Sequence, residues 1–223
     1  MQETGHFAGR ARKLGKSART RAKLMDAAVA VFAGEGFDAA SVNRIAQAAD
    51  VVNGTFYLHF KDKDELIAAV VYGILGEVME QLNRSMEGID DAVEWVSVRT
   101  RLVVEFMSAR PEWGWALTRA AARFQSFRGA VEGRLRQNLE RGARQGAFNV
   151  KVGDFLVDAH MSITQAAILR RLQGEGGAEA GSEAAELQLR MLGVPAKKAR
   201  KIAWKALPSL KIDIRHADLP VRP

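Results

Sequence analysis

The chain of 223 residues has no cysteine. It therefore cannot form a disulfide, and it offers neither a thiolate nucleophile nor the cysteine ligands of a zinc site. Histidine is scarce, and the four that occur are scattered, so we expect no metal and no cofactor. No apolar run approaches the roughly eighteen residues that a membrane span needs, and the first residues are basic and polar, unlike a signal peptide. These absences favour a cytoplasmic protein.

Recognisable catalytic groupings are missing as well. The sequence shows no set of nucleophile, base and acid, no metal-ligand spacing and no phosphate-binding loop, one of which catalysis would need. We therefore expect that the chain is not an enzyme.

Positive charge is concentrated near the two ends of the chain, which has a net charge of +7. Residues 1–23 carry seven Lys and Arg against Glu3, and residues 194–223 carry eight against two acidic residues. Basic flanks suit a polyanionic partner, because neutralising phosphates releases counterions. The alternative is that both are solvated tails that aid solubility.

Apolar residues recur with the helical period almost everywhere, and no segment alternates as a strand does, which predicts an all-α fold. A first helix is expected over 18–34, with an apolar stripe followed by glycines that end it. Ser41 is a natural N-cap for a second short helix, and a third runs from Asn53 to about His59. An Asp62-x-x-Glu65 capping pattern then opens a long fourth helix. The stripe of the first helix is Leu24, Ala27, Ala28, Val31 and Phe32.

The remainder of the chain shows the same helical periodicity and capping signals. Asp90 or Asp91 caps one helix, and Pro111 starts the next. Further helices are expected at about 127–145, 154–172, 183–192 and 196–206, with a flexible glycine-rich loop over 174–182. We divide the chain into a basic flexible arm (1–17), a small helical unit (18–64), a larger helical domain (65–207) and a tail (208–223).

Residues 41–60 predict a helix-turn-helix, a structure that reads DNA by placing its second helix in the major groove. Ala46 and Ala49 are small where the helices cross, and Asp50 lies in the turn. Gly54 allows the next helix to approach the DNA backbone closely, and Tyr57 offers a rigid hydroxyl to a phosphate. Lys63 lies in the first turn of the fourth helix, where an anion is favoured.

This stretch closely resembles the DNA-binding domain of the tetracycline-repressor (TetR) family, including its AcrR-like members. The resemblance runs from about Thr20 to Leu66. It rests on Phe32-x-x-x-Gly36-Phe37, Ile45-Ala-x-x-Ala49, Gly54-Thr-Phe-Tyr-x-x-Phe60 and Lys63-x-x-Leu66. As a composite the signal is specific, although each piece alone is weak.

The resemblance implies a homodimer with an N-terminal three-helix helix-turn-helix domain and a larger helical domain that binds a small molecule and forms the dimer. Carried over by position, eight residues would face DNA. Asn43, Asn53 and Thr55 are the expected base readers, since Asn pairs with adenine and Thr can meet a thymine methyl. Tyr57 and Lys63 are the expected phosphate contacts. The full set is Asn43, Arg44, Asn53, Gly54, Thr55, Tyr57, His59 and Lys63.

The chain departs from the common family pattern at two positions. Asp50 stands where a glycine is common in the turn, and an aspartate can adopt a left-handed conformation there at some cost. Val52 stands where a serine commonly caps the recognition helix, and valine cannot cap. The missing cap costs about 1 kcal/mol of helix stability unless Asn53 compensates.

The middle segment is rich in aromatic residues, which predicts an apolar effector pocket with a few polar handles. The alternative is that each aromatic is ordinary core. For His160, hydrogen-bonded structure with Asp158 as candidate partner is the alternative to ligand contact. The expected pocket residues are Phe106, Met107, Trp113, Thr118, Arg119, Phe124, His160 and Gln165.

For the dimer, the helices at 154–172 and 183–192 are favoured, because small and branched residues on one stripe allow close approach across a two-fold axis. The alternative is that these stripes face the chain's own core. The expected interface residues are Leu156, Ala159, Ile163, Ala166, Ala167, Leu187 and Met191.

Together these observations predict a sequence-specific DNA-binding transcriptional regulator that binds duplex operator DNA. The resemblance implies a repressor that is released by a largely apolar small-molecule effector. A helical architectural DNA-binding protein without an effector is the first alternative, and a helical enzyme with a helix-turn-helix-like corner is the second.

Overall fold

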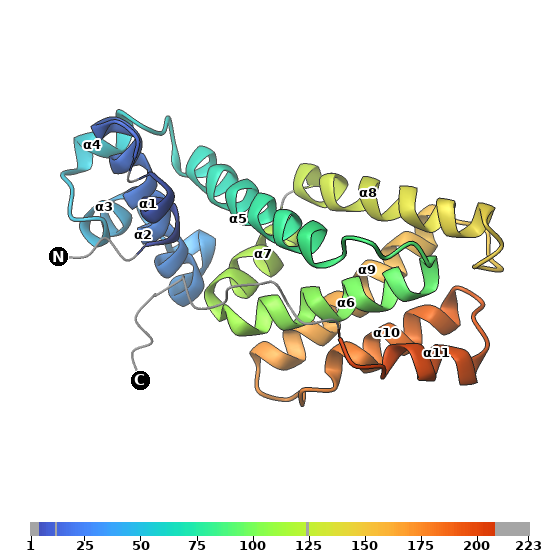
Figure 1. Ribbon diagram of the computed structural model, residues 1–223. Helices are drawn as coiled ribbons and strands as arrows, with labels where there is room; N and C mark the ends of the chain where they lie inside the picture. The colour runs from blue at the N-terminus through green and yellow to red at the C-terminus, as the bar shows by residue number, and fades with distance from the viewer. Residues whose placement is uncertain (1–4, 12, 124, 208–223) are drawn as a thin grey trace.

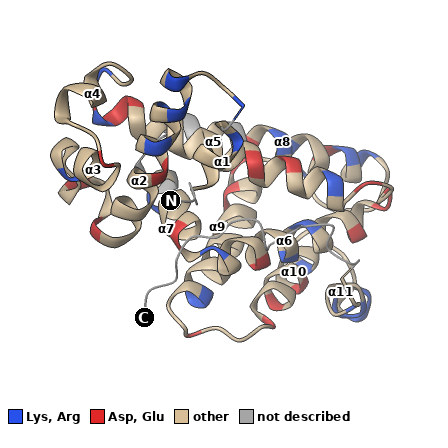
Figure 2. Cartoon of the chain, turned by 60° about the vertical axis from the view of Figure 1, so that its left-hand side comes forward, with Lys and Arg blue, Asp and Glu red and all other residues tan. Residues whose placement is uncertain are grey.

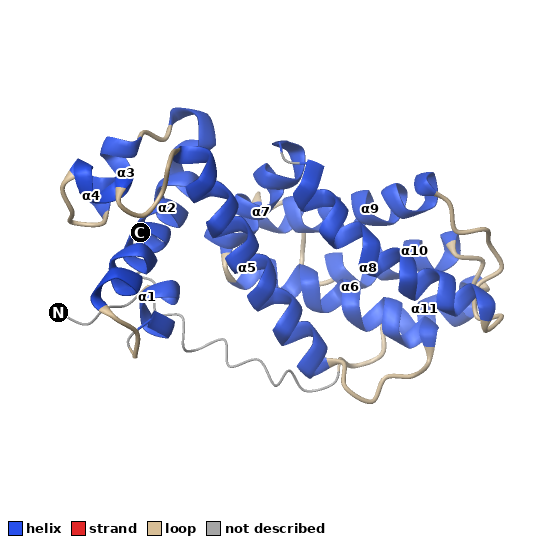
Figure 3. Ribbon diagram, turned by 90° about the horizontal axis from the view of Figure 1, so that it is seen from above, coloured by secondary structure: helices blue, strands red, loops and turns tan. Residues whose placement is uncertain are grey.

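The computed structural model describes residues 5–11, 13–123 and 125–207, and for residues 121–123, 125–128, 130 and 131 it describes the backbone alone. The regular structure within these ranges is entirely helical, as predicted (Figure 3). The tail expected over 208–223 lies outside the described residues. The helices are α1 (His6–Ala11), α2 (Lys16–Ala39), α3 (Val42–Ala48), α4 (Asn53–Tyr57), α5 (Lys63–Ser85), α6 (Ala92–Ala109), α7 (Pro111–Arg123), α8 (Gln125–Arg144), α9 (Asp154–Leu172), α10 (Ala180–Met191) and α11 (Ala196–Ala203).

The helices form two groups that α5 joins. Helices α1 to α4 make a small group at one end, which we call the head, and α6 to α11 make a larger bundle, which we call the body (Figure 1). Helix α5 starts in the head and runs along the body. None of the described helices is long and apolar enough to cross a membrane.

Three of the predicted helix starts are confirmed by their capping bonds. The side chain of Ser41 accepts from the backbone N–H of Arg44 at 3.1 Å. Asp62 caps α5 and Asp91 caps α6, each accepting from the N–H three residues later at 2.8 Å. Each cap satisfies a backbone donor that the first turn of a helix leaves free.

The first predicted helix is longer than expected. It continues past Gly34 to Ala39, and of the two glycines expected to end it, Gly36 breaks the helical path with a φ of 80°. A glycine adopts this left-handed conformation without the penalty that a Cβ atom imposes. The two C-terminal helices also differ at their ends, since α10 begins within the predicted loop and α11 is shorter than predicted.

The expected flexible arm is corrected in part, because residues His6–Ala11 form helix α1, which packs on α2. The carboxylate of Asp26 on α2 accepts from the backbone N–H of Phe7 at 2.9 Å and of Ala8 at 2.8 Å. Both donors belong to the first turn of a helix, where a carboxylate is favoured. A partner nineteen residues away in the chain left no local signal in the sequence.

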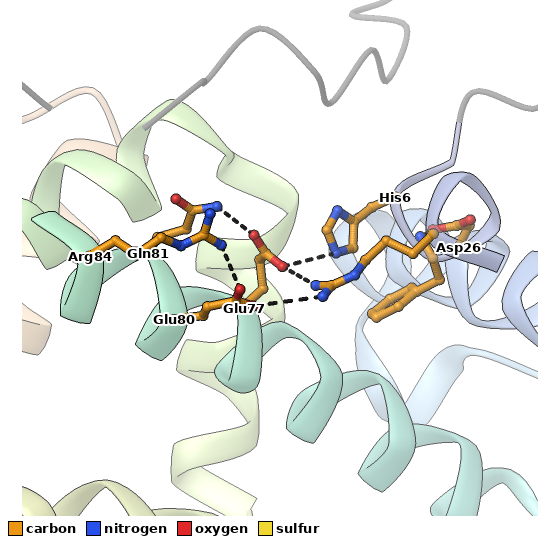
Figure 4. A network of polar contacts seen from close by, with 8 residues as sticks. His6, Asp26, Glu77, Glu80, Gln81 and Arg84 are labelled. Carbon is orange, nitrogen blue, oxygen red and sulfur yellow. Dashed lines mark hydrogen bonds and ion pairs between the residues drawn. The ribbon is translucent and has the colours of Figure 1, made fainter. Parts of the chain in front are cut away.

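Helix α1 also contacts the part of α5 that lies beyond the head (Figure 4). Glu77 on α5 pairs with Arg10 and lies 4.0 Å from Nε2 of His6. The His6 ring packs edge-on against Trp113 of α7, with the ring centroids 4.6 Å apart. Burial lowers the pKa of His6 to about 4, so this ring is neutral at neutral pH. Helix α1 thus links α2 to both α5 and α7.

Gly114 of α7 lies at a close helix contact in the body that leaves no room for a side chain. A Cβ atom at Gly114 of α7 would lie 2.8 Å from the backbone oxygen of Met107 and about as close to Leu172 of α9. A backbone oxygen cannot move aside as a flexible side chain can. Gly114 therefore sets the distance between α7 and α6.

We expect Gly114→Ala to lower the free energy of unfolding by about 1–3 kcal/mol, because the added methyl group overpacks this crossing. Urea denaturation followed by circular dichroism measures the change. Gly76→Ala is the matched control, since Gly76 lies within α5 with nothing within 4 Å of the added Cβ, and it should raise stability by about 0.5–1 kcal/mol. Equal effects of the two substitutions would contradict the role of Gly114.

Candidate DNA-binding surface and internal cavity

Helices α3 and α4 meet in the geometry that a helix-turn-helix requires. Ala46 and Ala49 are buried at the crossing, and the N–H of Val51 donates to the oxygen of Ala46 at 3.0 Å. Asp50 has a φ of 54°, the left-handed conformation expected of the residue in this turn. Helix α4 begins at Asn53, and Val52 before it provides no side-chain cap.

The residues predicted to face DNA lie mostly on the outer surface of this unit. Asn43, Arg44, Asn53, Gly54 and Tyr57 are exposed, whereas Thr55, His59 and Lys63 are half-buried. Tyr57 is 58% exposed, so its hydroxyl is available, although its ring rests edge-on against buried Phe56. Arg44 donates from Nε to Glu35 at 3.1 Å, which neutralises part of its charge.

Lys63 differs from the prediction of a phosphate contact. Its Nζ atom donates to the backbone oxygens of Phe37 at 2.7 Å, Ala40 at 2.9 Å and Asp38 at 3.4 Å. An ammonium group has three donors, and these carbonyls accept all three. The carbonyls lie at the end of α2, where a positive charge is favoured. In this structure Lys63 therefore joins α5 to α2.

Two exposed residues that the sequence analysis did not select lie beside the predicted ones. Gln47 and Val52 line a surface groove together with Asn43, Asp50 and Asn53. Gln47 follows Asn43 by one helical turn, a spacing that could have identified it. Val52 is 75% exposed, which is unusual for a valine and suits contact with a thymine methyl group.

Of the basic residues at the start of the chain, some contact other side chains and others are exposed. Arg10 is paired with Glu77, and the Arg21 guanidinium lies over the Phe60 ring, 4.6 Å from its centroid. Lys13, Lys16 and Arg19 are exposed. Figure 2 shows where the basic and acidic residues lie along the described helices.

The body contains a partly open cavity of about 140 Å³ between α5, α6, α7, α8 and α9. Its wall is mostly apolar, with Leu75, Val78, Met79 and Leu82 contributed by α5. The polar residues on the wall are Arg99, Thr118, His160, Thr164 and Gln165. An apolar cavity with a few polar groups is typical of a small-molecule site.

Four of the predicted pocket residues line this cavity: Met107, Thr118, His160 and Gln165. Phe106 and Trp113 are not among its lining residues and are buried side by side under the guanidinium of Arg110. For these two, the alternative of ordinary core is the correct one. Phe124 lies outside the described residues.

Arg119, predicted as a polar handle of the pocket, points away from the cavity. Its Nη1 atom donates to the backbone oxygens of Phe32 and, at 3.0 Å, Ala33 on α2. These carbonyls precede the break at Gly36, which interrupts the hydrogen bonding of α2. A charged donor stabilises the fold more when it binds such carbonyls than when it is buried without a partner in an apolar wall. Arg119 therefore joins α7 to α2.

Arg99 lines the cavity, and the sequence analysis missed it. It is 8% exposed, and its guanidinium lies 5.6 Å from the centroid of the Trp95 ring one turn earlier on α6. Burial lowers the pKa of Arg99 to about 10, so the side chain stays charged at neutral pH. Arg99 lies four residues after Trp95 and four before Val103, so all three share the inner face of α6. This spacing could have identified Arg99 from the sequence.

A buried polar network holds the α9 side of the cavity. Gln188 of α10 donates to the backbone oxygen of His160 at 2.9 Å and to the Thr164 hydroxyl at 2.7 Å. Its own side-chain oxygen accepts from Thr100 of α6 at 2.6 Å. This fully buried glutamine thus fixes α9 and α6 relative to α10.

The predicted dimer residues have mixed exposure. Ala166 and Leu187 are exposed, whereas Ala167 is buried and faces the chain's own core, contrary to the prediction that it faces a partner. Phe155, which was not predicted, is 86% exposed at the start of α9. The half-buried members are Leu156, Ala159, Ile163 and Met191.

Comparison with known families covers both parts of the chain. Residues 24–70 match the bacterial regulatory proteins of the tetR family. Residues 91–205 match the tetracyclin repressor-like C-terminal domain. The chain belongs to the TetR family.

The curated relatives found by sequence match less than half of the chain. The HTH-type transcriptional regulator YvdT of Bacillus subtilis, itself uncharacterised, is 35% identical over 69 residues, which are 31% of this chain and 36% of that protein. The HTH-type transcriptional repressor KstR2 of Rhodococcus jostii is 38% identical over 64 residues, 29% of this chain and 31% of that protein. The matches thus span about a third of the length of these relatives.

Solved structures of TetR-family proteins match most of the chain. RolR in complex with resorcinol has a TM-score of 0.67 and 26% identity, and the alignment covers 87% of this chain and 98% of RolR. FadR of Bacillus subtilis in complex with stearoyl-CoA has a TM-score of 0.66 and 15% identity, covering 78% of this chain and 98% of FadR. The second likeness shows the fold alone.

We expect Lys63→Met to lower the free energy of unfolding by about 1–3 kcal/mol, because three carbonyls at the end of α2 lose their shared donor. Thermal unfolding measures the change. Lys61→Met, at an exposed neighbouring position, should change stability by less than about 0.5 kcal/mol. Unchanged stability of Lys63→Met, with weaker DNA binding, would show that Lys63 acts on phosphate instead.

Proposed function

We propose that this TetR-family chain is a sequence-specific DNA-binding transcriptional regulator, a repressor that a small-molecule effector releases from its operator in the cytoplasm. One observation carries the proposal: a single helix, α5, packs in the head beside the exposed α3–α4 surface and also forms a wall of the cavity. An architectural DNA-binding protein would have no need of that cavity.

The exposed face of α3 and α4 is the proposed DNA contact. Asn43 and Asn53 would read bases, joined by Gln47 and Val52 in the same groove, while Tyr57 would bind a phosphate. The half-buried Thr55 and His59 are secondary candidates. Phosphate contacts position the protein, and base contacts give the sequence preference.

The proposed regulator acts as a homodimer that pairs through α9 and α10. Phe155, Ala159 and Ala166 follow one another along the outer side of α9, and Leu187 is 54% exposed on neighbouring α10. Exposed large apolar side chains on adjoining helices are typical of an interface. Two-fold pairing would set the recognition helices about 34 Å apart, one turn of DNA.

The cavity suggests an effector of about one ring. At about 140 Å³ it is close to the size of a cavity that holds benzene. RolR, which matches the chain over most of its length, is known in complex with resorcinol, a single-ring molecule. Effector binding would favour a conformation whose recognition helices no longer fit successive grooves.

The DNA contacts are tested with duplexes selected from a random pool by the purified protein. We expect Tyr57→Phe to weaken binding to all duplexes alike, and Asn53→Ala to change the preferred sequence. Fluorescence anisotropy gives the affinities, which should fall with salt. Equal losses for Asn53→Ala on every duplex, or no salt dependence in the wild type, would contradict the proposal.

The dimer is tested with Leu187→Arg, which places a charge in the proposed interface. We expect the variant to be monomeric by light scattering and to bind the selected duplex at least about tenfold more weakly, because half of the contacts are lost. Glu87→Arg, at an exposed position after the end of α5, is the control for the added charge. A dimeric Leu187→Arg variant with unchanged affinity would refute this interface.

A further inference from the structure

We propose that the effector of this chain is a small organic acid, whose carboxylate pairs with Arg99 inside the cavity while its apolar ring fills the rest. The inference rests on the proposed function and specifies the chemical class of the ligand. Four features carry it: an unpaired buried cation, a nearby second cation, an unpartnered histidine nitrogen and an otherwise apolar wall.

The first feature is the isolation of Arg99. Among the described residues it makes no hydrogen bond and no ion pair, and its one favourable contact is the face of Trp95. A buried guanidinium has five donors and is costly to desolvate unless a partner accepts them. A carboxylate fits it, because two oxygens accept from the planar fork at once.

The acidic residues around the cavity are committed elsewhere. Glu77 of α5 is paired with Arg10. On α8, Glu132 is paired with Arg136 at 2.8 Å, and Asp154 at the start of α9 accepts from the same arginine. None of these carboxylates pairs with Arg99, which leaves its charge available to a bound anion.

The second feature adds to the positive potential. Arg99 and Arg134 of α8 both line a smaller cavity of about 110 Å³ that shares Met79, Leu82 and Arg99 with the main one. The proximity of Arg134 lowers the pKa of Arg99 further, because two like charges oppose each other. An anion placed between these cavities would be attracted by both side chains.

The third feature is His160, which lines the cavity and is 2% exposed. Its Nδ1 atom is buried and has no hydrogen-bond partner among the described residues. Burial, and the charge of Arg99, lower the pKa of His160 to about 3, so the ring is neutral and cannot supply a second positive charge. A neutral imidazole still donates one hydrogen bond, which a carboxylate oxygen can accept.

The fourth feature limits the rest of the molecule. Beyond the polar groups, the wall consists of Leu, Val, Met and Ile side chains, which include Val103, Leu117, Leu135 and Ile168. These favour an apolar body, and the volume of the cavity admits about one six-membered ring. Benzoate therefore has the size and charge that the site requires.

The test compares benzoate with benzamide, a neutral molecule of nearly the same shape, and with phenol as a neutral ring. Titration calorimetry on the full chain gives the affinities. We expect benzoate to bind at least about tenfold more tightly than benzamide, because only the acid forms a charged pair with Arg99. Benzoate should also release the selected duplex at lower concentration than benzamide does.

The variant Arg99→Met removes the charge and keeps an apolar side chain of similar length. We expect it to lose the preference for benzoate over benzamide, and its ligand-free form to melt about 2–4 °C higher, because a desolvated cation is gone. The matched control is Arg101→Met on the same helix, whose guanidinium donates instead to the backbone oxygen of Lys205. It should keep the preference.

The possible failures are distinguishable. If phenol and benzamide bind and release the duplex but benzoate binds no better, the inference is wrong and the proposed function stands. If Arg99→Met keeps the preference, Arg99 is not the carboxylate site. If none of the three rings binds, the inference and the proposed effector site both fail, and the DNA contacts are judged separately by the anisotropy experiment.

Discussion

The continuity of α5 is the constraint on which the rest of the structure depends. The first turns of this helix, with Leu66, Ile67 and Val70, are buried in the same core as α2, α3 and α4. Its later turns place Leu75, Val78, Met79 and Leu82 on the cavity wall. A straight helix transmits displacement along its length, so a change of shape at the cavity reaches the head without any loop between them.

Much of this architecture could be predicted from local sequence signals. Capping residues such as Ser41, Asp62 and Asp91 determine helix starts because their partners lie three residues away. The turn at Asp50 was likewise predictable, since few residues tolerate a positive φ. Helical periodicity identified the buried face of α5, because the pattern of apolar residues over a few consecutive turns is enough to predict it.

The site was less predictable, because its residues are defined by contacts between distant segments. Lys63, Arg119 and Asp26 each bind backbone groups that lie 18 to 87 residues away in sequence. Arg119 and Arg99 are both arginines within apolar helices, and only the three-dimensional arrangement shows that one holds α2 while the other lines the cavity. The sequence also could not tell that Trp113 belongs to the core and not to the cavity wall, because both places favour an apolar side chain.

The attachments between head and body also limit how the head can move. Besides the covalent path through α5, the head is held by Arg119 at the carbonyls of α2 and by α1 at Glu77 and Trp113. Helix α2 also packs directly on α7, and the α1 contact adds a further restraint on rotation of the head. The α1 contact includes Arg10, which is 59% exposed in its side chain, so water can replace it most easily. Opening at α1 would leave α5, Arg119 and the packing of α2 on α7 to set the path along which the head of the proposed dimer moves.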